Sequence, residues 1–284
     1  MTAALDALVN MLDLEQIEVN LFRGRSPDEN RQRVFGGQVA GQALVAATRT
    51  VETGHYVHSL HAYFLRPGDP SVPIVYQVDR IRDGKSFWTR RVVAIQHGRA
   101  IFNLQASFHI PEDGLDYQVD APADTPDPDT LPDFKQRIEP YMEQLGALVD
   151  VPRPIDVRYA DADPFTRGGT PSLGQRVWLR ADGRLPDDPT LHACIVTYAS
   201  DMTLLDTAIL PFGYAWDTPG MQMASLDHAM WFHRPFRADE WLLYVQQPVS
   251  THAARGLANG NIYTRDGRLA VSVMQEGLVR VAQR

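Results

Sequence analysis

Asp201 stands among apolar residues on a predicted helix, where a charged side chain is unusual. The helix is predicted over residues 189–209, because Asp188 is a favoured N-cap and Pro189 suits a first turn. Its apolar face is formed by Leu191, Cys194, Ile195, Tyr198, Met202 and Leu205. Asp201 follows Tyr198 by three residues and precedes Leu205 by four, so we expect it on the same face.

A carboxylate on a buried helix face has a specific chemical use. Burial disfavours the charged form of the side chain and raises the pKa of the carboxyl group. The dipole near the helix C-terminus, where Asp201 is expected, acts in the same direction. A carboxylate of this kind suits a general base. The alternative is that Asp201 turns outward at the rim of the helix and is solvated.

Two other polar residues occupy apolar positions in predicted strands. Gln275 is in phase with the apolar residues of the last strand, and Ser225 is predicted to share a strand face with Asp227. A buried glutamine or serine needs hydrogen-bond partners, which could be side chains or backbone groups. His228 comes three residues after Ser225 and is predicted on the opposite face, which argues against a Ser–His nucleophile pair. Asp201, Ser225 and Gln275 are therefore the candidate site.

The elements that would position these residues are indicated by a repeated phrase. The chain reads SLHAYFLRP at 59–67 and SLDHAMWFHRP at 225–235. Each phrase follows a predicted helix and precedes segments rich in Val, Ile, Tyr, Phe and Trp with glycine turns, which is typical of antiparallel strands. One helix can cover so much sheet only if the sheet curls around it. We therefore predict an α+β double hotdog fold; chance similarity of aromatic strands is the alternative.

The two repeats are predicted at residues 1–110 and 136–284. Residues 111–135 between them are rich in Asp and Pro, and we interpret them as a solvated linker. The first predicted helix region, residues 34–51, contains no Asp or Glu. A site built on a helix carboxylate therefore belongs to the C-terminal repeat and occurs once per chain.

Composition excludes several classes of function. The 284 residues carry a formal net charge of −8, which argues against sequence-independent binding of nucleic acid. Cys194 is the single cysteine, so an internal disulfide and a multi-cysteine metal site are excluded. The first 22 residues lack Lys and Arg, and no run approaches the ~20 apolar residues of a membrane span. We expect a cytoplasmic protein that is not bound to a membrane.

Common cofactor and metal motifs are absent from the sequence. There is no P-loop, no G-x-G-x-x-G after a predicted strand and no H-E-x-x-H. The spacing of His55, His58 and His61 suggests a metal site at first sight, but on a strand it places successive side chains on opposite faces. We expect no metal and no cofactor.

Several stretches, in order along nearly the whole chain, resemble the acyl-CoA thioesterase II family. They are FRGRSPDENRQRVFGGQ at 22–38, YASDMTLL at 198–205, DHAMWFHRPF at 227–236, WLLY at 241–244, ARG at 254–256 and VMQEGLVR at 273–280. The resemblance implies a double-hotdog hydrolase that cleaves fatty acyl-CoA to free acid and coenzyme A. It also implies a catalytic set of Asp201, Ser225 and Gln275, with Ser225 where the family often has Thr.

The mechanism that the resemblance implies needs no covalent enzyme intermediate. Asp201 would accept a proton from a water held by Ser225 and Gln275, and backbone N–H groups could stabilise the oxyanion. The phosphates of coenzyme A need cationic partners, for which Arg255 and Lys85, in matching turns of the two repeats, are candidates. Ordinary surface charges are the alternative for these two residues.

Two other functions stay open, together with the oligomeric state. A hotdog enoyl-CoA hydratase could use the Asp227–His228 pair, although adjacent strand residues face opposite ways. A non-catalytic acyl-CoA-binding protein would need none of the three polar residues. Hotdog sheets expose edges and apolar faces, so we expect a homodimer or homotetramer.

Overall fold

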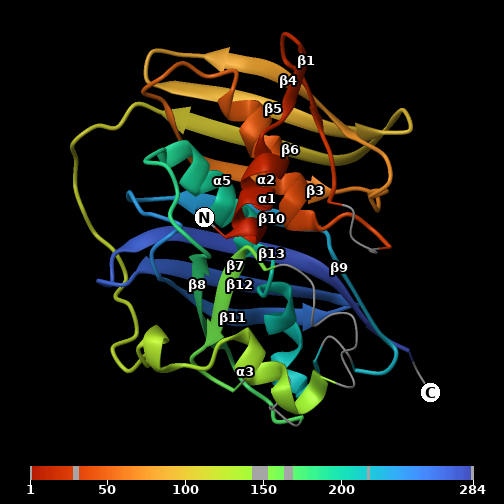
Figure 1. The fold of residues 1–284 in the computed structure, drawn as a ribbon, viewed down its shortest axis with the longest axis vertical. Coiled ribbons are helices and arrows are strands. Elements are labelled where there is room, and N and C mark those ends of the chain that lie inside the picture. The colour runs from red at the N-terminus through yellow and green to blue at the C-terminus, as the bar shows by residue number, and fades with distance from the viewer. Residues whose placement is uncertain (1, 28–31, 143–152, 163–168, 216–217, 283–284) are drawn as a thin grey trace.

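The centre of the molecule is one antiparallel sheet that runs through both halves of the chain (Figure 1). The computed structural model describes residues 2–27, 32–142, 153–162, 169–215 and 218–282, so residues 28–31 of the stretch 22–38 lie outside the described residues. Within these ranges the sheet has thirteen strands, in the order β1-β2-β4-β5-β6-β3-β10-β13-β12-β11-β8-β7, with β9 paired to β13.

Most of the strands alternate inward apolar and outward polar residues, as expected for a sheet with one buried face. In the first half they are β1 (Glu15–Glu18), β2 (Leu21–Gly24), β3 (Tyr56–Phe64), β4 (Ile74–Asp83), β5 (Phe87–Gln96) and β6 (Arg99–His109). In the second half they are β7 (Ile155–Tyr159), β8 (Gln175–Ala181), β9 (Met221–Ser225), β10 (Asp227–Phe232), β11 (Leu242–His252), β12 (Arg255–Thr264) and β13 (Leu269–Val281).

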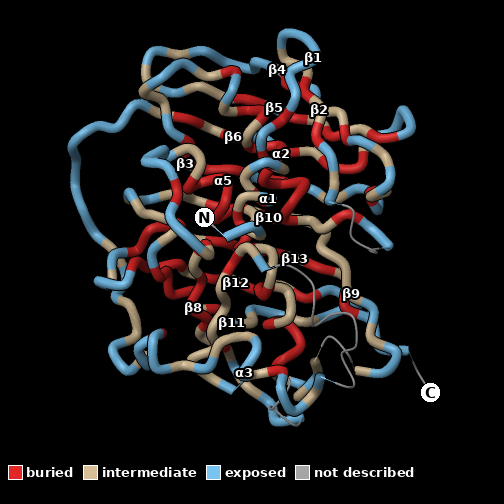
Figure 2. The backbone as a smooth tube through the Cα atoms, in the orientation of Figure 1, coloured by how far each residue is buried: buried red, intermediate tan, exposed pale blue. Residues whose placement is uncertain are grey.

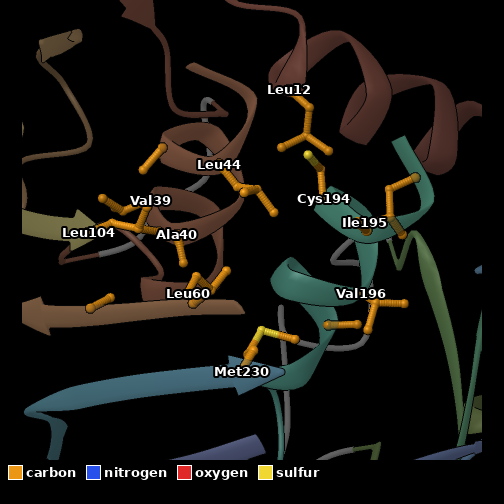
Figure 3. Close-up of a cluster of buried hydrophobic side chains, with 14 of the residues drawn as sticks. Leu12, Val39, Ala40, Leu44, Leu60, Leu104, Cys194, Ile195, Val196 and Met230 are labelled. Atoms are coloured by element: carbon orange, nitrogen blue, oxygen red, sulfur yellow. The ribbon is translucent and has the colours of Figure 1, made fainter. Parts of the chain in front are cut away.

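The sheet curls around two central helices. These are α2 (Gly36–Thr48) from the first half and α5 (Pro189–Ser200) from the second. The other helical elements are α1 (Ala3–Leu12), α3 (Phe134–Ile138) and the 3-10 helices η1 (Pro128–Thr130), η2 (Glu139–Tyr141) and η4 (Leu205–Phe212). Buried residues concentrate on the central helices and on the strands around them (Figure 2). Figure 3 shows side chains of α2 and α5 meeting apolar residues of β3, β6 and β10.

The two central helices pack with their backbones in contact. A Cβ atom added to Gly37 would lie 2.3 Å from the carbonyl oxygen of Tyr198, and one on Gly41 would lie 3.3 Å from that of Cys194. Because the later residue of α2 meets the earlier residue of α5, the helices run antiparallel, and the four-residue spacing on each keeps the contact along one line. The N-terminus of α2 therefore meets the C-terminus of α5.

The repeated phrase lies where the two halves join. Strand β3 pairs antiparallel with β10, and the register places His61 opposite Ala229. Each half therefore follows its central helix with the strand that contacts the other half. The pattern relates the halves by a pseudo-twofold axis between β3 and β10, and it joins their sheets into one.

The pseudo-equivalent ends of the two central helices differ in charge. Arg49 is the C-cap of α2, and Asp201 is the C-cap of α5. The Arg49 guanidinium binds the carboxylate of Asp13 and the carbonyl oxygen of Leu14, just beyond the end of α1. The first half thus uses this position to hold α1 in place.

Residues 111–135, interpreted as a solvated linker, are joined to the C-terminal repeat by ion pairs. Most of their side chains are exposed, and the segment runs down one side of the molecule (Figures 1 and 2). Ion pairs join Asp116 to Arg234, Asp124 to Arg176, and both Asp127 and Asp129 to Arg265. The Asp residues therefore find their partners on the C-terminal repeat, and the prolines lower the entropy lost on ordering.

The segment Pro189–Phe212 has the length and hydropathy of a membrane-spanning helix, which the sequence analysis did not anticipate. Its mean hydropathy reaches 1.3 over an 18-residue window, but 78% of that window is buried inside the fold. The segment consists of α5 and η4 with a turn between them. Its apolar character is that of a central element surrounded by sheet.

Candidate active site

The chain turns out of α5 at Asp201. The helix ends at Ser200, and Asp201 caps it with φ −85° and ψ −2°, so the predicted helix over 189–209 stops earlier than expected. Ser200 and Thr203 make buried hydrogen bonds to His228 and Gln246 on neighbouring strands, at 2.8 and 2.5 Å. The Asp201 carboxylate itself points toward β9 and β13, where it meets Ser225 and Gln275.

The three predicted site residues lie in direct contact. Gln275 Nε2 donates to Asp201 Oδ1 at 2.6 Å and to Ser225 Oγ at 2.8 Å. The Ser225 hydroxyl donates to Asp201 Oδ1 at 3.3 Å. Asp201 and Ser225 line a cavity, whereas Gln275 is fully buried behind them. Residues 74 positions apart in the sequence thus form one hydrogen-bonded group.

The surroundings of Asp201 make its carboxylate unusually basic. Burial raises the pKa of Asp201 to about 6, and hydrogen bonds from Gln275, Ser225 and the Gly37 N–H limit the rise. The residue is not wholly enclosed, since part of its surface opens into the cavity. Asp201 is therefore mostly ionised at neutral pH, yet it accepts a proton more readily than a solvated aspartate.

The N-terminus of α2 completes the surroundings of the carboxylate. Phe35, the N-cap residue, provides no side-chain hydrogen bond, and the Gly37 N–H bonds Asp201. A Cβ atom on Gly36 would lie 2.6 Å from Asp201 Oδ2, so this approach requires glycine. The positive end of the α2 dipole stabilises a carboxylate placed there. Sequence reasoning missed this contact, although the Gly36–Gly37 pair at the start of a predicted helix was a usable signal.

The site opens into a cavity of about 530 Å³ that both halves line. Apolar side chains from the first half, among them Phe35, Val39, Phe64 and Phe102, form much of its wall. Asp201 and Ser225 provide the polar end, and Arg33 and Arg66 lie at its exposed part. The cavity can therefore hold an apolar chain with a polar group next to Asp201.

The strand that contains Ser225 is interrupted, which corrects two predictions. Ser225 pairs with Gly277, but Ala229 pairs with Met274, so one extra residue lies between β9 and β10. Such a bulge reverses the alternation of side chains along the strand. Ser225 and His228 consequently both face inward, while the Asp227 carboxylate accepts the Glu276 N–H at 2.7 Å. The predictions that Ser225 shares a face with Asp227 and that His228 faces the other way are wrong.

The candidate phosphate-binding residues lie away from the cavity wall. Arg255 is exposed and its Nε donates to Glu276 Oε1 at 2.9 Å. Lys85 is exposed in the turn between β4 and β5, at the opposite end of β6 from the cavity residue Phe102. Neither residue lines the cavity, and their role in binding coenzyme A stays a prediction.

Within the described ranges, no group of three or more His, Cys, Asp or Glu side chains could hold a metal ion. His58 of the HYVHSLH stretch instead contacts Ser107, with its Nε2 2.7 Å from the hydroxyl oxygen.

Asp201→Asn is expected to stabilise the protein at pH 7.5 by about 1–3 kcal/mol, because it removes a partly buried charge. The folded-state pKa of about 6 lies above the value of about 4 in an unfolded chain. The wild type therefore gains stability from this group on acidification, and the advantage of the variant should vanish below about pH 4. Urea unfolding of both proteins between pH 4 and 7.5 measures the difference. An advantage independent of pH would contradict the raised pKa.

The chain is similar to known proteins over its whole length. Residues 25–109 match the family model described as acyl-CoA thioesterase N-terminal domain, and residues 153–278 match the model described as acyl-CoA thioesterase. Acyl-coenzyme A thioesterase 8 of Homo sapiens is 40% identical over 96% of this chain and 89% of its own. The crystal structure of acyl-CoA thioesterase II TesB2 from Mycobacterium marinum is 45% identical, with a TM-score of 0.80 over 97% of this chain and 99% of that one.

A more distant structure confirms the fold class. A protein with a hot dog fold from Alicyclobacillus acidocaldarius superimposes with a TM-score of 0.78 at 18% identity, over 98% of this chain and 99% of its own. The predicted arrangement, helices surrounded by antiparallel sheet, is thus found in solved structures.

Proposed function

The chain belongs to the acyl-CoA thioesterase family and hydrolyses fatty acyl-CoA to free fatty acid and coenzyme A, and we propose that Asp201 activates the attacking water. The observation that carries this proposal is the Asp201 carboxylate at the cavity wall, bonded to both Ser225 and Gln275. A base needs to reach the proton that it removes, and Asp201 lines the cavity, where a water can reach its carboxylate.

The reaction proceeds through a tetrahedral intermediate. Asp201 takes a proton from the water while the oxygen of the water forms a bond to the thioester carbonyl carbon. The carbon–sulfur bond then breaks, and the departing thiolate recovers the proton from Asp201. The N-terminus of α2 lies beside this carboxylate. The positive end of the α2 dipole stabilises the negative charge that develops on the carbonyl oxygen.

Ser225 and Gln275 have different parts in this scheme. The Ser225 hydroxyl lines the cavity and has a lone pair for a proton of the water. Gln275 is fully buried, and its Nε2 is occupied by Asp201 and Ser225. We therefore assign it to holding the other two in place rather than to touching the water.

Two assays separate hydrolysis from the alternative functions. Palmitoyl-CoA with a thiol reagent reports release of coenzyme A, and crotonyl-CoA reports hydration by loss of the enone absorbance. We expect thiol release alone. Asp227 and His228 do not form a hydratase pair, because one bonds the backbone of Glu276 and the other is buried against Ser200. Enone loss or simple binding without thiol release would overturn the proposal.

The acid limb of the pH profile should report the basicity of Asp201. We expect kcat/KM for palmitoyl-CoA to fall about tenfold per pH unit below pH 6, because the protonated carboxyl cannot accept a proton. The measurement covers pH 4 to 8 at constant ionic strength. A limb centred near pH 4, the value of a solvated aspartate, would contradict the scheme.

For the phosphates of coenzyme A, we propose Arg33 and Arg66 as partners in addition to Arg255 and Lys85. Both line the exposed part of the cavity, so they lie on the route by which the acyl chain enters. Arg66 is held by a 2.6 Å hydrogen bond to the carbonyl oxygen of Ala100. Guanidinium groups bind phosphate well because they donate several hydrogen bonds in one plane.

We also propose a cytoplasmic homodimer or homotetramer without membrane or nucleic-acid partners. A single buried cysteine suits a reducing compartment, and the net charge of −8 disfavours nucleic acid. Exposed apolar residues on the strands, among them Tyr56, Tyr63, Ile81 and Phe87, support association through the sheet.

A further inference from the structure

A buried histidine lies next to the candidate site without an assigned purpose. His228 on β10 is fully buried, and its Nε2 contacts Ser200 Oγ at 2.8 Å. Its Nδ1 has no hydrogen-bond partner among the described residues. Gln275 Oε1 is likewise buried and without a partner there. Unpaired buried polar atoms are rare and costly, so this coincidence needs an explanation.

The strand register brings the two unpaired atoms together. Ala229 of β10 pairs with Met274 of β13, and continuing this register by one residue, to the edge of the bulge, places His228 opposite Gln275. Both side chains face inward, and Cβ atoms of directly opposed residues lie about 4.5–5.5 Å apart. Gln275 Nε2 points to Asp201 and Ser225, so its Oε1 points away from them.

We propose that His228 is a positioning residue whose Nδ1–H donates to Gln275 Oε1 and so fixes the direction of the Gln275 amide. In this structure the two atoms are not within hydrogen-bond geometry, so the proposed bond requires a rotation of the amide or the imidazole. Gln275 also acts to raise the pKa of His228, which agrees with the two side chains being neighbours.

The protonation state of His228 fits this assignment. Burial lowers the pKa of His228 to about 4, so the imidazole is neutral at neutral pH and has one N–H donor. The Ser200 hydroxyl can donate to Nε2, which is 2.8 Å away, in preference to the Thr197 carbonyl oxygen at 3.0 Å. The proton of the imidazole then resides on Nδ1, facing Gln275.

The consequence for catalysis rests on the proposed function of Asp201. If the amide of Gln275 turned by half a rotation, Oε1 would face the Asp201 carboxylate in place of Nε2. Two oxygen atoms would then repel each other, and the pKa of Asp201 would rise. The His228 Nδ1–H prevents this turn, because after the turn it would face the NH2 group of Gln275 instead of the acceptor Oε1.

Substitutions of His228 test the proposal. His228→Leu removes both ring nitrogens, whereas His228→Asn keeps a donor near the position of Nδ1 and His228→Gln keeps one near that of Nε2. We expect His228→Leu and His228→Gln to lower kcat about 3- to 10-fold with KM within twofold, and to move the acid limb of kcat/KM to higher pH. His228→Asn should keep kcat and the acid limb close to those of the wild type. Equal profiles for Asn and Gln would overturn the proposal.

The matched control is His192→Leu, because His192 is also a buried histidine but lies near the opposite end of α5 from Asp201. It should lower thermal stability without moving the acid limb. In a Gln275→Ala background, His228→Leu should cause no further loss of kcat, since His228 acts through Gln275. A full additional loss there would show a role other than positioning.

Two outcomes separate this inference from the proposed function. If Asp201→Asn keeps its activity, the water-activation scheme fails whatever His228 does. If Asp201→Asn is inactive and His228→Leu has the wild-type pH profile, the positioning role alone fails. Should the His228 variants not fold, Ser200→Ala supplies the test, because it removes the donor that keeps the proton on Nδ1. It should move the acid limb in the same direction, and an unchanged limb would count against the proposal.

Discussion

Asp201→Asn is expected to lower kcat for palmitoyl-CoA by about 100- to 10,000-fold, the usual contribution of a general base, while the protein stays folded. Asparagine keeps the shape of the side chain and an oxygen that accepts the hydrogen bonds from Gln275 and Ser225. It cannot take a proton from water. Steady-state kinetics with a thiol reagent measures the loss, and circular dichroism checks the fold.

Double substitutions show whether the site works as a unit. Ser225→Ala and Gln275→Ala should each lower kcat less than Asp201→Asn, because each removes a hydrogen bond and leaves the base in place. Combined with Asp201→Asn, neither should add its full effect. Near-normal turnover by Asp201→Asn would mean that another group activates the water.

Gly37→Ala is expected to destabilise the protein by about 2–3 kcal/mol, the range for overpacking a close contact. The added Cβ would lie 2.3 Å from the carbonyl oxygen of Tyr198 and 2.5 Å from the ring of Phe35. Because the Tyr198 oxygen belongs to the backbone of α5, relief requires moving one helix away from the other. That movement also draws the Gly37 N–H from Asp201, so kcat should fall as well. Urea unfolding and steady-state kinetics measure the two effects.

Gly41→Ala is the matched control in the same helix. Its Cβ would lie 3.2 Å from Leu12 and 3.3 Å from the Cys194 oxygen, distances that small shifts accommodate. Alanine also favours a helix over glycine by about 1 kcal/mol, so the net change should stay within about 1 kcal/mol. Equal stability of the two alanine variants would show that the helices separate without cost.

The sequence was informative where a residue type conflicted with its position. Asp201 and Gln275 occupied apolar phases, and the structure brings both to one point. The repeated phrase predicted two similar halves because each copy followed a helix and preceded strands, and those copies are the paired strands β3 and β10. Periodicity works for such elements since each side chain faces either the core or solvent.

The features that escaped prediction depend on single residues or on contacts between distant segments. One extra residue between β9 and β10 reverses the side-chain direction, and simple alternation could not reveal that. The Gly37 N–H reaches Asp201 from the other half, so no local pattern contained it. The ion pairs of the Asp-rich stretch 111–135 could not be predicted, because its arginine partners, such as Arg265, lie far along the chain.

The contact between α2 and α5 has a consequence in genetic terms. One half of the gene encodes Asp201, the proposed base, and the other half encodes the helix terminus, at Gly37, whose N–H bonds the Asp201 carboxylate. The pseudo-equivalent position at the end of α2 holds Arg49, which binds Asp13 at the end of α1. The two halves are therefore not two catalysts joined end to end. In the proposed scheme they form one catalyst whose two coding halves are inherited together, so that selection on a single reaction acts on both.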